Sequence, residues 1–296
     1  MANFFFYSLT VLIWGSTWLA IKFQLGVVSP AVSIAYRFAL AALFLFLWCA
    51  LTRRPLKFTR RAHFFMLLQG TFLFALNYLF FYLAELELTS GLAAVVFSTI
   101  VSMNIINGRI FLGTPIEWKV LLGGGLGLLG LTLLFWPEVA RFEAGDEALL
   151  ALGYCFLATY LASLGNIISA RNQQQSLPVM QSNAYGMAYG ALLMLLVALL
   201  SGASLSIETT FSYLGSLFYL ALFGSVIAFG CYLSLVGRIG PGRAAYTTLL
   251  FPLVALVLST IWEDFQWSGP AVAGIALILC GNYLALIKAK PVKAGG

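Results

Sequence analysis

Nine polar or aromatic side chains stand inside long apolar runs of this 296-residue sequence. In lipid, a polar side chain needs a partner within the protein, so these side chains should point inward. Rings combined with a few hydroxyls and amides suit a small amphipathic organic molecule better than a bare ion. The alternative is that each residue only ties two helices together. The candidate cavity-lining residues are Trp14, Thr17, Asn77, Tyr78, Tyr82, Ser98, Asn166, Tyr246 and Thr247.

Arg37 is the single charge that lies deep in an apolar run. It follows Pro30 by seven residues, or ~10 Å of helix at 1.5 Å per residue. An ionisable residue at this depth is a candidate functional group, here one that attracts or holds a substrate carboxylate. The structural alternative is that Arg37 bonds helix ends or pairs with Glu85 or Glu87. The sequence leaves both interpretations open.

Motifs for several other chemistries are absent. The sequence has no G-x-x-x-x-G-K-[ST] phosphate loop and no H-E-x-x-H zinc motif. Its only aspartates, Asp146 and Asp264, fall at expected helix ends, so no aspartyl dyad can form within the membrane. The cysteines share no close spacing with one another or with His63, the only histidine, and are expected to be buried thiols. We therefore expect no metal, no cofactor and no enzymatic activity. The cysteines are Cys49, Cys155, Cys231 and Cys280.

The composition is that of an integral membrane protein. Hydrophobic residues make up 61% of the chain and charged residues only 9%, against about 25% charged in a soluble domain. One water-facing globule could not bury so much apolar surface. The net charge of +6 comes from basic residues in short loops, which indicates membrane topology rather than nucleic-acid binding.

Ten apolar runs approach the ~20 residues that span a bilayer. The predicted fold is therefore all-α and integral to the membrane, with ten transmembrane helices. Pro252 falls inside the ninth run and should kink it. The runs are 3–23, 30–51, 62–83, 89–110, 116–136, 147–170, 178–200, 211–235, 241–262 and 269–288.

The distribution of charges orients these helices. Ten spans place both termini on one side, and only Lys22 and Arg141 fall on the other. Glu117 is the sole carboxylate on the basic side. Because cytoplasmic loops carry an excess of Lys and Arg, both termini are predicted to be cytoplasmic. The basic side holds Arg53, Arg54, Lys57, Arg60, Arg61, Arg109, Lys119, Arg171, Arg238, Arg243, Lys288, Lys290 and Lys293.

One stretch of the chain occurs twice, at residues 88–133 and 239–284. An offset of 151 residues brings Gly91, Ala93 and Ala94 onto Gly242, Ala244 and Ala245. Glu85 and Glu87 precede the first copy, whereas Arg238 precedes the second, so the copies should insert in opposite senses. We predict one domain (1–296) with inverted halves 1–138 and 147–290. Inverted repeats are typical of transporters that alternate access to a central site.

Small residues form two G-x-x-x-G faces, at Gly123 and Gly127 and at Gly186 and Gly190. Such faces let helices approach closely. Both a dimer contact and internal packing are compatible with them; we expect internal packing and a monomer.

Several motifs in order resemble the drug/metabolite transporter superfamily, EamA-type. They are Trp14-Gly15-Ser16-Thr17, Pro30 leading to Arg37-Phe38, Gly240-Pro241-Gly242-Arg243-Ala244-Ala245, Pro252, Glu263, and Gly274 through Gly281. The first half departs from the pattern, since Val101 stands where Pro252 stands in the second half and Leu112 where Glu263 stands. Within the superfamily the chain most resembles bacterial YddG-type aromatic amino acid exporters. The resemblance implies ten helices, inverted repeats, a bacterial inner-membrane location and export of metabolites such as phenylalanine, tyrosine or tryptophan.

The functional hypothesis is a secondary carrier that exports aromatic amino acids or related metabolites by alternating access. No carboxylate or histidine is expected at mid-membrane depth, which favours transport down the substrate gradient; Glu85, Glu87 or Glu263 at the outer rim would be the groups for ion coupling. Its partners would be a small molecule and the lipid bilayer, with no nucleic acid. Alternatives are a drug, sugar or purine/nucleotide-metabolite exporter, and a non-transporting membrane scaffold.

Overall fold

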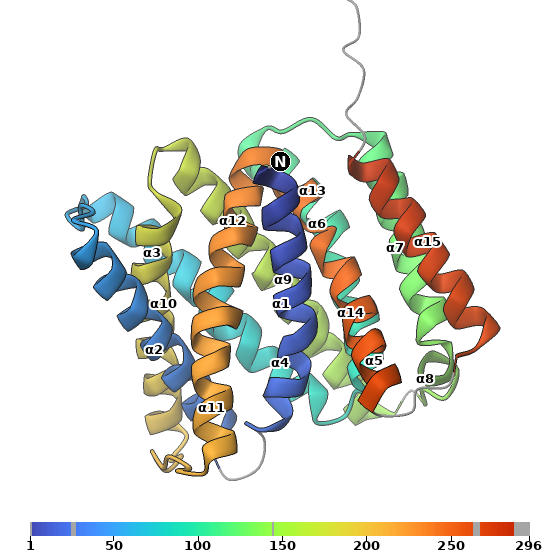
Figure 1. Cartoon of the computed structure of the whole chain (residues 1–296), viewed down its shortest axis with the longest axis horizontal. Helices are drawn as coiled ribbons and strands as arrows, with labels where there is room; N and C mark the ends of the chain where they lie inside the picture. Colours follow the sequence, from blue (N-terminus) through green and yellow to red (C-terminus); the bar gives the residue numbers. More distant parts are fainter. Residues whose placement is uncertain (1, 25–27, 144, 263–266, 287–296) are drawn as a thin grey trace, which may run out of the picture.

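The computed structural model describes residues 2–24, 28–143, 145–262 and 267–286, and every regular element in these ranges is a helix (Figure 1). Some predictions concern residues that lie outside these ranges. Residues 263–266 include Glu263 and Asp264, and residues 287–296 include three of the lysines assigned to the basic side. The elements are α1 (Ala2–Lys22), α2 (Pro30–Leu51), α3 (Arg60–Thr71), η1 (Phe72–Leu76), α4 (Asn77–Glu85), α5 (Ser90–Ser98), α6 (Ile100–Leu112), α7 (Trp118–Leu134), α8 (Trp136–Ala140), α9 (Asp146–Gln174), α10 (Val179–Leu200), α11 (Phe211–Tyr219), η2 (Leu220–Ile227), α12 (Ala228–Ile239), α13 (Pro241–Ala244), α14 (Thr247–Trp262) and α15 (Gly269–Leu286).

Local chemistry sets the ends of these helices. Pro30 opens α2, where a missing backbone N–H leaves no hydrogen bond unmade. The hydroxyl of Thr59 accepts from the Ala62 backbone N–H and caps α3, and Thr89 caps α5 in the same way. Gly113 ends α6 in the left-handed conformation, with φ of 67°, which glycine adopts without steric cost.

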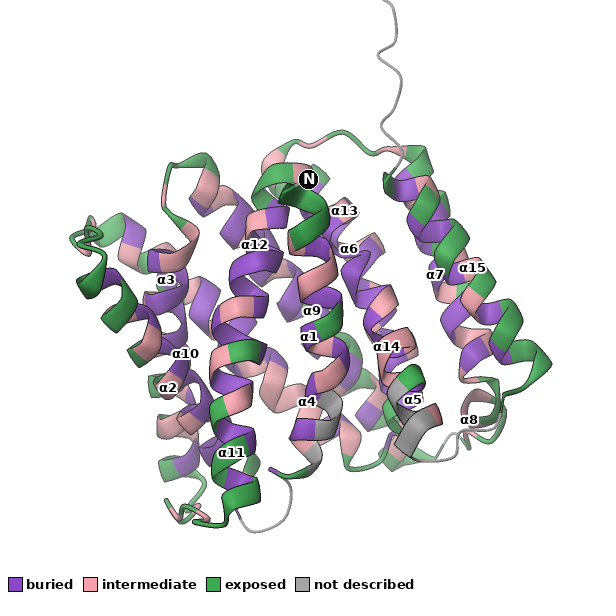
Figure 2. Ribbon diagram, in the orientation of Figure 1, coloured by how far each residue is buried: buried purple, intermediate pink, exposed green. Residues whose placement is uncertain are grey.

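Several helices are long and apolar enough to cross a membrane. Among the described residues there are seven such segments, and two shorter apolar helices, Trp118–Leu134 and Pro241–Val257, accompany them. Figure 2 shows exposed residues along the outer faces of the bundle, and many of these are large and apolar, such as Leu43, Leu47 and Leu200. An apolar exterior on helices of this length is suited to lipid contact. The exact count of ten spans stays a prediction.

Two of the expected uninterrupted spans are broken. The run at 89–110 divides at Thr99, and the run at 241–262 divides at Ala245 and Tyr246. Helix α14 continues through Pro252, where a kink stays a prediction. Both breaks adjoin consecutive hydroxyl residues. Ser98 and Thr99 donate to the carbonyls of Val95 and Val96, and these local bonds compete with the regular helix ladder.

Two other spans contain π-helical turns. The segment from Arg60 to Glu85 widens at η1, and the segment from Phe211 to Ile239 widens at η2. π-Helical turns are rare and often occur at functional sites. The predicted ends of these two spans, at 83 and 235, were also short of the observed ends.

The repeat extends over the whole helix order. The offset that relates the two copies brings the helix start at Arg60 onto Phe211, Ser90 onto Pro241 and Trp118 onto Gly269. In Figure 1, α1 begins at the upper edge beside the N-terminus, whereas α9, its counterpart, follows α8 at the lower edge. Counterpart helices thus run in opposite directions, as an inverted repeat requires. The predicted boundaries 1–138 and 147–290 remain a proposal.

Helices that correspond to each other in the two halves pack together. The counterparts α2 and α10 pack against each other, as do α7 and α15 at the edge of the bundle (Figure 1). Likewise α1 packs against α12 and α14, while α9 packs against α4 and α6. Helices of the two halves are therefore interleaved around a common centre.

The glycine faces are used inside the chain, as predicted. A Cβ on Gly123 would lie 2.6 Å from the carbonyl oxygen of Gly281, and one on Gly130 would lie 2.5 Å from that of Gly274. Gly186 meets Gly70 of α3 in the same manner. Only glycine permits these backbone approaches between helices.

The cysteine prediction holds in part. Cys49, Cys155 and Cys231 are buried and free, but Cys280 is free and exposed on α15. The prediction failed there because an apolar run does not distinguish a face that packs on protein from one that meets lipid.

Candidate functional site

A cavity of about 190 Å³ lies between helices of the two halves. At ~15 Å³ per water position it has room for about a dozen water molecules or one small solute. Its walls are mostly apolar and aromatic. It is lined by Trp14, Thr17, Ile21, Arg37, Leu73, Asn77, Tyr78, Phe81, Tyr82, Glu85, Ala93, Ala94, Phe97, Ile100, Ala162, Asn166, Phe229, Tyr232, Thr248, Phe251 and Pro252.

Most of the residues singled out from the sequence meet at this cavity. They come from α1, α2, α4 and α9, so residues far apart in the chain converge on one space. Their role in binding a substrate stays a prediction. The candidates on the cavity wall are Trp14, Thr17, Arg37, Asn77, Tyr78, Tyr82 and Asn166.

Three candidates lie off the wall. The hydroxyl of Ser98 donates to the Val95 carbonyl at 2.6 Å, and that of Thr247 donates to the Ala244 carbonyl at 2.9 Å. Tyr246 is fully buried and donates to the backbone carbonyl of Val120 on α7. These side chains fix the two helix breaks and a helix contact, and the neighbouring Thr248 lines the cavity instead.

Trp14 is the centre of the aromatic wall. Its ring centroid lies 5.0 Å from those of Phe229 and Tyr232 and 6.3 Å from that of Phe251. Its indole N–H donates to the Gly224 carbonyl at 3.1 Å, which fixes the ring plane. The edge-to-face angles of 72° and 84° to Phe229 and Phe251 are those that aromatic pairs prefer. The wall is thus a rigid apolar surface.

Arg37 lies on the wall with its guanidinium held from two sides. Its Nε donates to the Ser225 hydroxyl at 2.9 Å, and its Cζ lies 5.2 Å from the centroid of the Tyr78 ring. The residue is 8% exposed. Among the described residues no carboxylate lies within ion-pair distance of Arg37, so the expected pairing with Glu85 or Glu87 is absent there. A buried cation without a counter-charge favours the arrival of an anionic group.

Two amide oxygens on the wall are unsatisfied. The Oδ1 atoms of Asn77 and Asn166 are buried without a hydrogen-bond partner, whereas Asn166 Nδ2 donates to the Tyr232 hydroxyl at 2.9 Å. A buried acceptor without a donor costs about 1–3 kcal/mol. Both residues line the cavity, while their Oδ1 atoms lie buried within its wall in the described state.

Sequence reasoning missed most of the second half's contribution. Phe229 and Thr248 stand in apolar runs and gave no individual signal, and Phe251 was noted only as a neighbour of Tyr246 and Thr247 on one helix face. The repeat offset does find them: it pairs Tyr78 with Phe229, Phe81 with Tyr232, Phe97 with Thr248 and Ile100 with Phe251. All eight residues line the cavity, so the cavity surrounds the axis that relates the halves.

Glu85, which was expected at the outer rim, is the last residue of α4 and also contributes to the cavity wall. Within the described residues, the wall of the cavity therefore carries one cation, Arg37, and one carboxylate. No group of three or more His, Cys, Asp or Glu suited to a metal ion occurs in the part of the chain that the structure describes.

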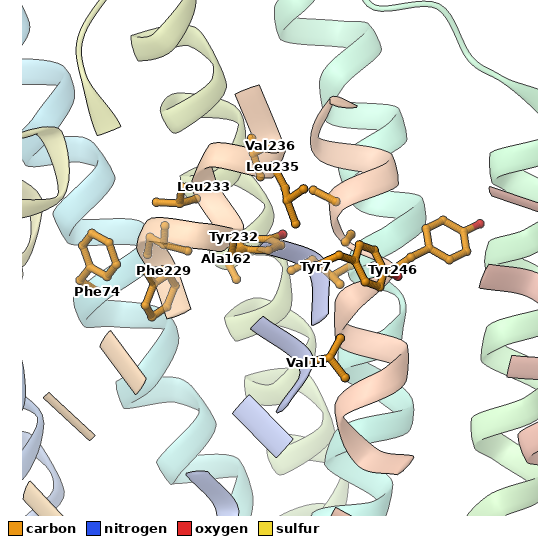
Figure 3. Packing of buried hydrophobic residues seen from close by; sticks show 14 of the residues in the cluster. Tyr7, Val11, Phe74, Ala162, Phe229, Tyr232, Leu233, Leu235, Val236 and Tyr246 are labelled. Carbon is orange, nitrogen blue, oxygen red and sulfur yellow. The ribbon is translucent and has the colours of Figure 1, made fainter. Parts of the chain in front are cut away.

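A layer of buried side chains lies toward the N-terminal end of α1. In Figure 3, Tyr7, Tyr232 and Tyr246 lie at about one level, with Leu235 and Val236 nearby. Tyr7 donates from its hydroxyl to Asn282 Oδ1 on α15. The residues that line the cavity instead include Thr17, Ile21 and, at the end of α4, Glu85. The cavity therefore extends toward the C-terminal ends of α1 and α4, and buried side chains fill the bundle toward the N-terminus.

Comparison with known proteins agrees with the fold. The model of the EamA-like transporter family matches residues 2–136 and 149–287. A solved crystal structure superposes with a TM-score of 0.80 at 18% identity, covering 96% of each chain, which shows the fold alone.

Curated relatives align along nearly the whole chain. "Uncharacterized inner membrane transporter YedA" of Escherichia coli (strain K12) is 27% identical, covering 96% of this chain and 92% of its own. "Probable amino-acid metabolite efflux pump" of the same organism is 26% identical, covering 97% and 96%. "Protein PagO" of Salmonella typhimurium is 25% identical, covering 95% and 91%.

Proposed function

We propose, from the premise that this chain belongs to the EamA-like transporter family, that it exports aromatic amino acids or related small metabolites. The chain is a membrane transporter of that family, with several apolar helices that can span the bilayer. Transport of a small molecule, rather than catalysis, is the activity that the family supports. The substrate, the direction and the coupling are the proposal.

The observation that supports the substrate class is the pairing of Arg37 with the two unsatisfied amide oxygens on one aromatic cavity wall. An α-amino acid carries a carboxylate, an ammonium group and a side chain. The carboxylate would bind the guanidinium of Arg37 through charge-assisted hydrogen bonds. The ammonium group would donate to Asn77 and Asn166, and an aromatic side chain would pack against Trp14 and Tyr78.

Alternating access follows from the inverted halves. The state described is closed on the N-terminal side by the layer around Tyr7 and Tyr246. We infer that this side is cytoplasmic and that rocking of one half against the other opens the cavity toward it. A bacterial inner-membrane location, cytoplasmic termini and a monomeric carrier complete the proposal. The printed names of two relatives, an inner membrane transporter and an amino-acid metabolite efflux pump, support it.

The finer resemblance, to YddG-type aromatic exporters, is not established by relatives at 23–27% identity. The sequence motifs and the composition of the cavity wall support it. A sugar or purine metabolite would leave the Arg37 charge without a partner unless it carried an anionic group. The aromatic wall and Arg37 together favour the amino acid.

An organic cation is the second candidate, because Glu85 lies on the cavity wall. A cavity without an acidic residue would argue against a cationic drug. Glu85 lines this cavity, so that argument does not apply. Glu85 and Arg37 then make opposite predictions about which ligands bind.

Counterflow into proteoliposomes tests the proposal. Purified protein is reconstituted, loaded with unlabelled phenylalanine, and offered labelled phenylalanine, its decarboxylated amine phenethylamine, an aliphatic amino acid and a nucleoside. Labelled phenylalanine should accumulate several-fold above the other three. If phenethylamine alone accumulates, the substrate class is an organic cation and not an amino acid. If none of the four compounds accumulates, both proposed substrate classes are rejected.

A further inference from the structure

A second pocket opens away from the central cavity, at the edge of the bundle that carries the N-terminus. It has a volume of about 470 Å³ and lies between the start of α3 and the end of α9. Of the described residues that line it, three are cationic and none is acidic. The residues that line it are Lys57, Phe58, Thr59, Arg61, Ala62, Arg171, Gln175 and Leu177.

The cations of this pocket lack counter-charges. Among the described residues, no carboxylate lies within 4.0 Å of Lys57, Arg61 or Arg171. Arg61 and Arg171 carry like charges and line the same pocket. Glu117, the carboxylate expected at this end of the bundle, pairs with Arg243 instead. An anion between the two arginines would relieve the repulsion and satisfy both guanidinium groups.

Arg171 is held in place before any ligand arrives. Its guanidinium lies 3.4 Å from the centroid of the Phe65 ring and donates to Asn172 Oδ1 at 3.3 Å. Asn172 in turn donates to Gln69 at 3.1 Å, and Gln69 donates to Asn183 at 3.0 Å. These three amides are fully or almost fully buried, so a chain of hydrogen bonds anchors the pocket floor to the bundle.

The opposite wall is also fixed. The Tyr185 hydroxyl donates to the Leu56 carbonyl at 2.7 Å and so ties the segment before α3 to α10. Thr59 caps α3, and the positive end of that helix dipole adds to the field of the cations. The pocket is therefore preformed, which lowers the entropic cost of binding.

Helix α3, whose first turn lines the pocket, also exposes apolar side chains. Phe64 and Leu67 follow Arg60 on one face of α3 at i+4 and i+7, and Phe64 is 53% exposed. A cationic pocket on a helix that exposes apolar side chains matches a molecule with an anionic head and a hydrocarbon tail. A free inorganic anion would bind in the pocket but would make no contact with Phe64 and Leu67.

We propose that this pocket binds the phosphate-ester headgroup of an anionic phospholipid, whose acyl chains lie along Phe64 and Leu67. The headgroup would bridge Arg61 on α3 and Arg171 on α9. Because these helices belong to different halves, the lipid would join the halves at this edge of the bundle. The proposal does not depend on the identity of the transported substrate.

Native mass spectrometry of the purified full chain, with phosphatidylglycerol or phosphatidylcholine added to the detergent, tests the proposal. Wild-type protein should retain phosphatidylglycerol in preference to phosphatidylcholine. At roughly 1 kcal/mol per cation, each of Arg61→Gln and Arg171→Gln should weaken that retention about fivefold. Arg109→Gln is the matched control, because Arg109 is an exposed cation in the last turn of α6 and does not line the pocket.

Two further arms separate the sources of the anion and the effects on folding. Glycerol 3-phosphate that displaces the lipid at equal concentration would assign the pocket to a free phosphate ester, with the same residues. The thermal unfolding midpoint should rise with phosphatidylglycerol in wild type and in Arg109→Gln but not in Arg61→Gln/Arg171→Gln. Equal loss in Arg109→Gln, or unchanged retention in the double variant, would overturn the proposal.

Discussion

The Nε of Arg37 on α2 donates to the hydroxyl of Ser225 within η2, across 2.9 Å and between the two halves of the chain. Ser225 also donates to the carbonyl of Leu220, five residues earlier, which is the spacing of a π-helical turn. The π-helical turn therefore orients the Ser225 hydroxyl, and this hydroxyl in turn orients the guanidinium of Arg37. The position of Arg37 on the cavity wall depends on an unusual backbone in the other half.

Arg37→Gln should weaken binding of amino acid substrates selectively. Loss of a hydrogen bond to a charged group costs about 1.5–3 kcal/mol, which corresponds to a tenfold or greater rise in KM. Uptake of phenylalanine and of phenethylamine, measured in the same liposomes, should show the loss for phenylalanine alone. An equal loss for both compounds would mean that Arg37 only supports the fold.

Tyr78→Ala should reduce transport without abolishing membrane insertion. The Tyr78 ring borders the cavity and lies beside both Arg37 and Phe38, whose centroid is 5.1 Å away. Loss of one aromatic contact costs about 0.5–1.5 kcal/mol, so initial efflux rates at low substrate should fall roughly threefold to tenfold. Tyr78→Phe serves as the control and should keep most of the rate. Wild-type efflux from Tyr78→Ala would remove Tyr78 from the binding site.

Ser98→Ala and Asn166→Ala should behave differently, although both were candidates from the sequence. Ser98 bonds only its own helix, and its replacement should leave KM within about twofold. Asn166 lines the cavity and bonds Tyr232, so its replacement should raise KM about tenfold, by the ~1–3 kcal/mol of a lost buried hydrogen bond. Equal KM values for the two variants would contradict the conclusion that Asn166, and not Ser98, lines the substrate cavity.

Gly123→Ala should destabilise the protein, whereas Gly125→Ala should not. The new methyl at Gly123 would meet the Gly281 carbonyl oxygen at 2.6 Å, while the space around Gly125 is open. Overpacking of this kind costs about 1–3 kcal/mol, and alanine in an open helical position gains up to ~1 kcal/mol. Thermal unfolding in detergent compares the two variants. A lower midpoint for Gly125→Ala than for Gly123→Ala would show that α7 and α15 pack differently.

An imposed pH gradient should leave wild-type uptake unchanged within about twofold. Among the described residues, Glu85 is the one acidic group on the cavity wall, and transport down the substrate gradient needs no proton. Labelled substrate uptake is measured at equal internal pH with and without an acidic exterior. Strong stimulation that disappears in Glu85→Gln would instead make the carrier proton-coupled.

The fold was largely predictable because its signals are additive over many residues. About twenty positions in each apolar run together indicate a membrane-spanning helix. Pro30 and Pro241 predict helix starts, and helices α2 and α13 begin at these residues. The offset between Trp118 and Gly269 is visible in the sequence and in the helix order. The π-helical turns were not predictable, since they arise from tertiary packing and not from local composition.

The site was less predictable because each residue had to be judged alone. Thr247 and Thr248 are chemically the same and adjacent, yet only Thr248 lines the cavity. A helix break two residues earlier decides which of them faces inward. Glu85 lies at the end of α4, as its position in the sequence predicts, but the sequence does not show that the cavity reaches that far.

The wide turn at η1 also sets a constraint on chain length. One residue of an α-helix corresponds to a rotation of about 100°. A π turn holds one residue more than an α turn. Deletion of a single residue between Phe72 and Leu76 should therefore convert the wide turn to an ordinary one and leave Asn77, Tyr78 and Phe81 facing the cavity. The same deletion in the regular helix of α4 would rotate the residues that follow it by about 100°, so it should be far more harmful than a deletion within η1.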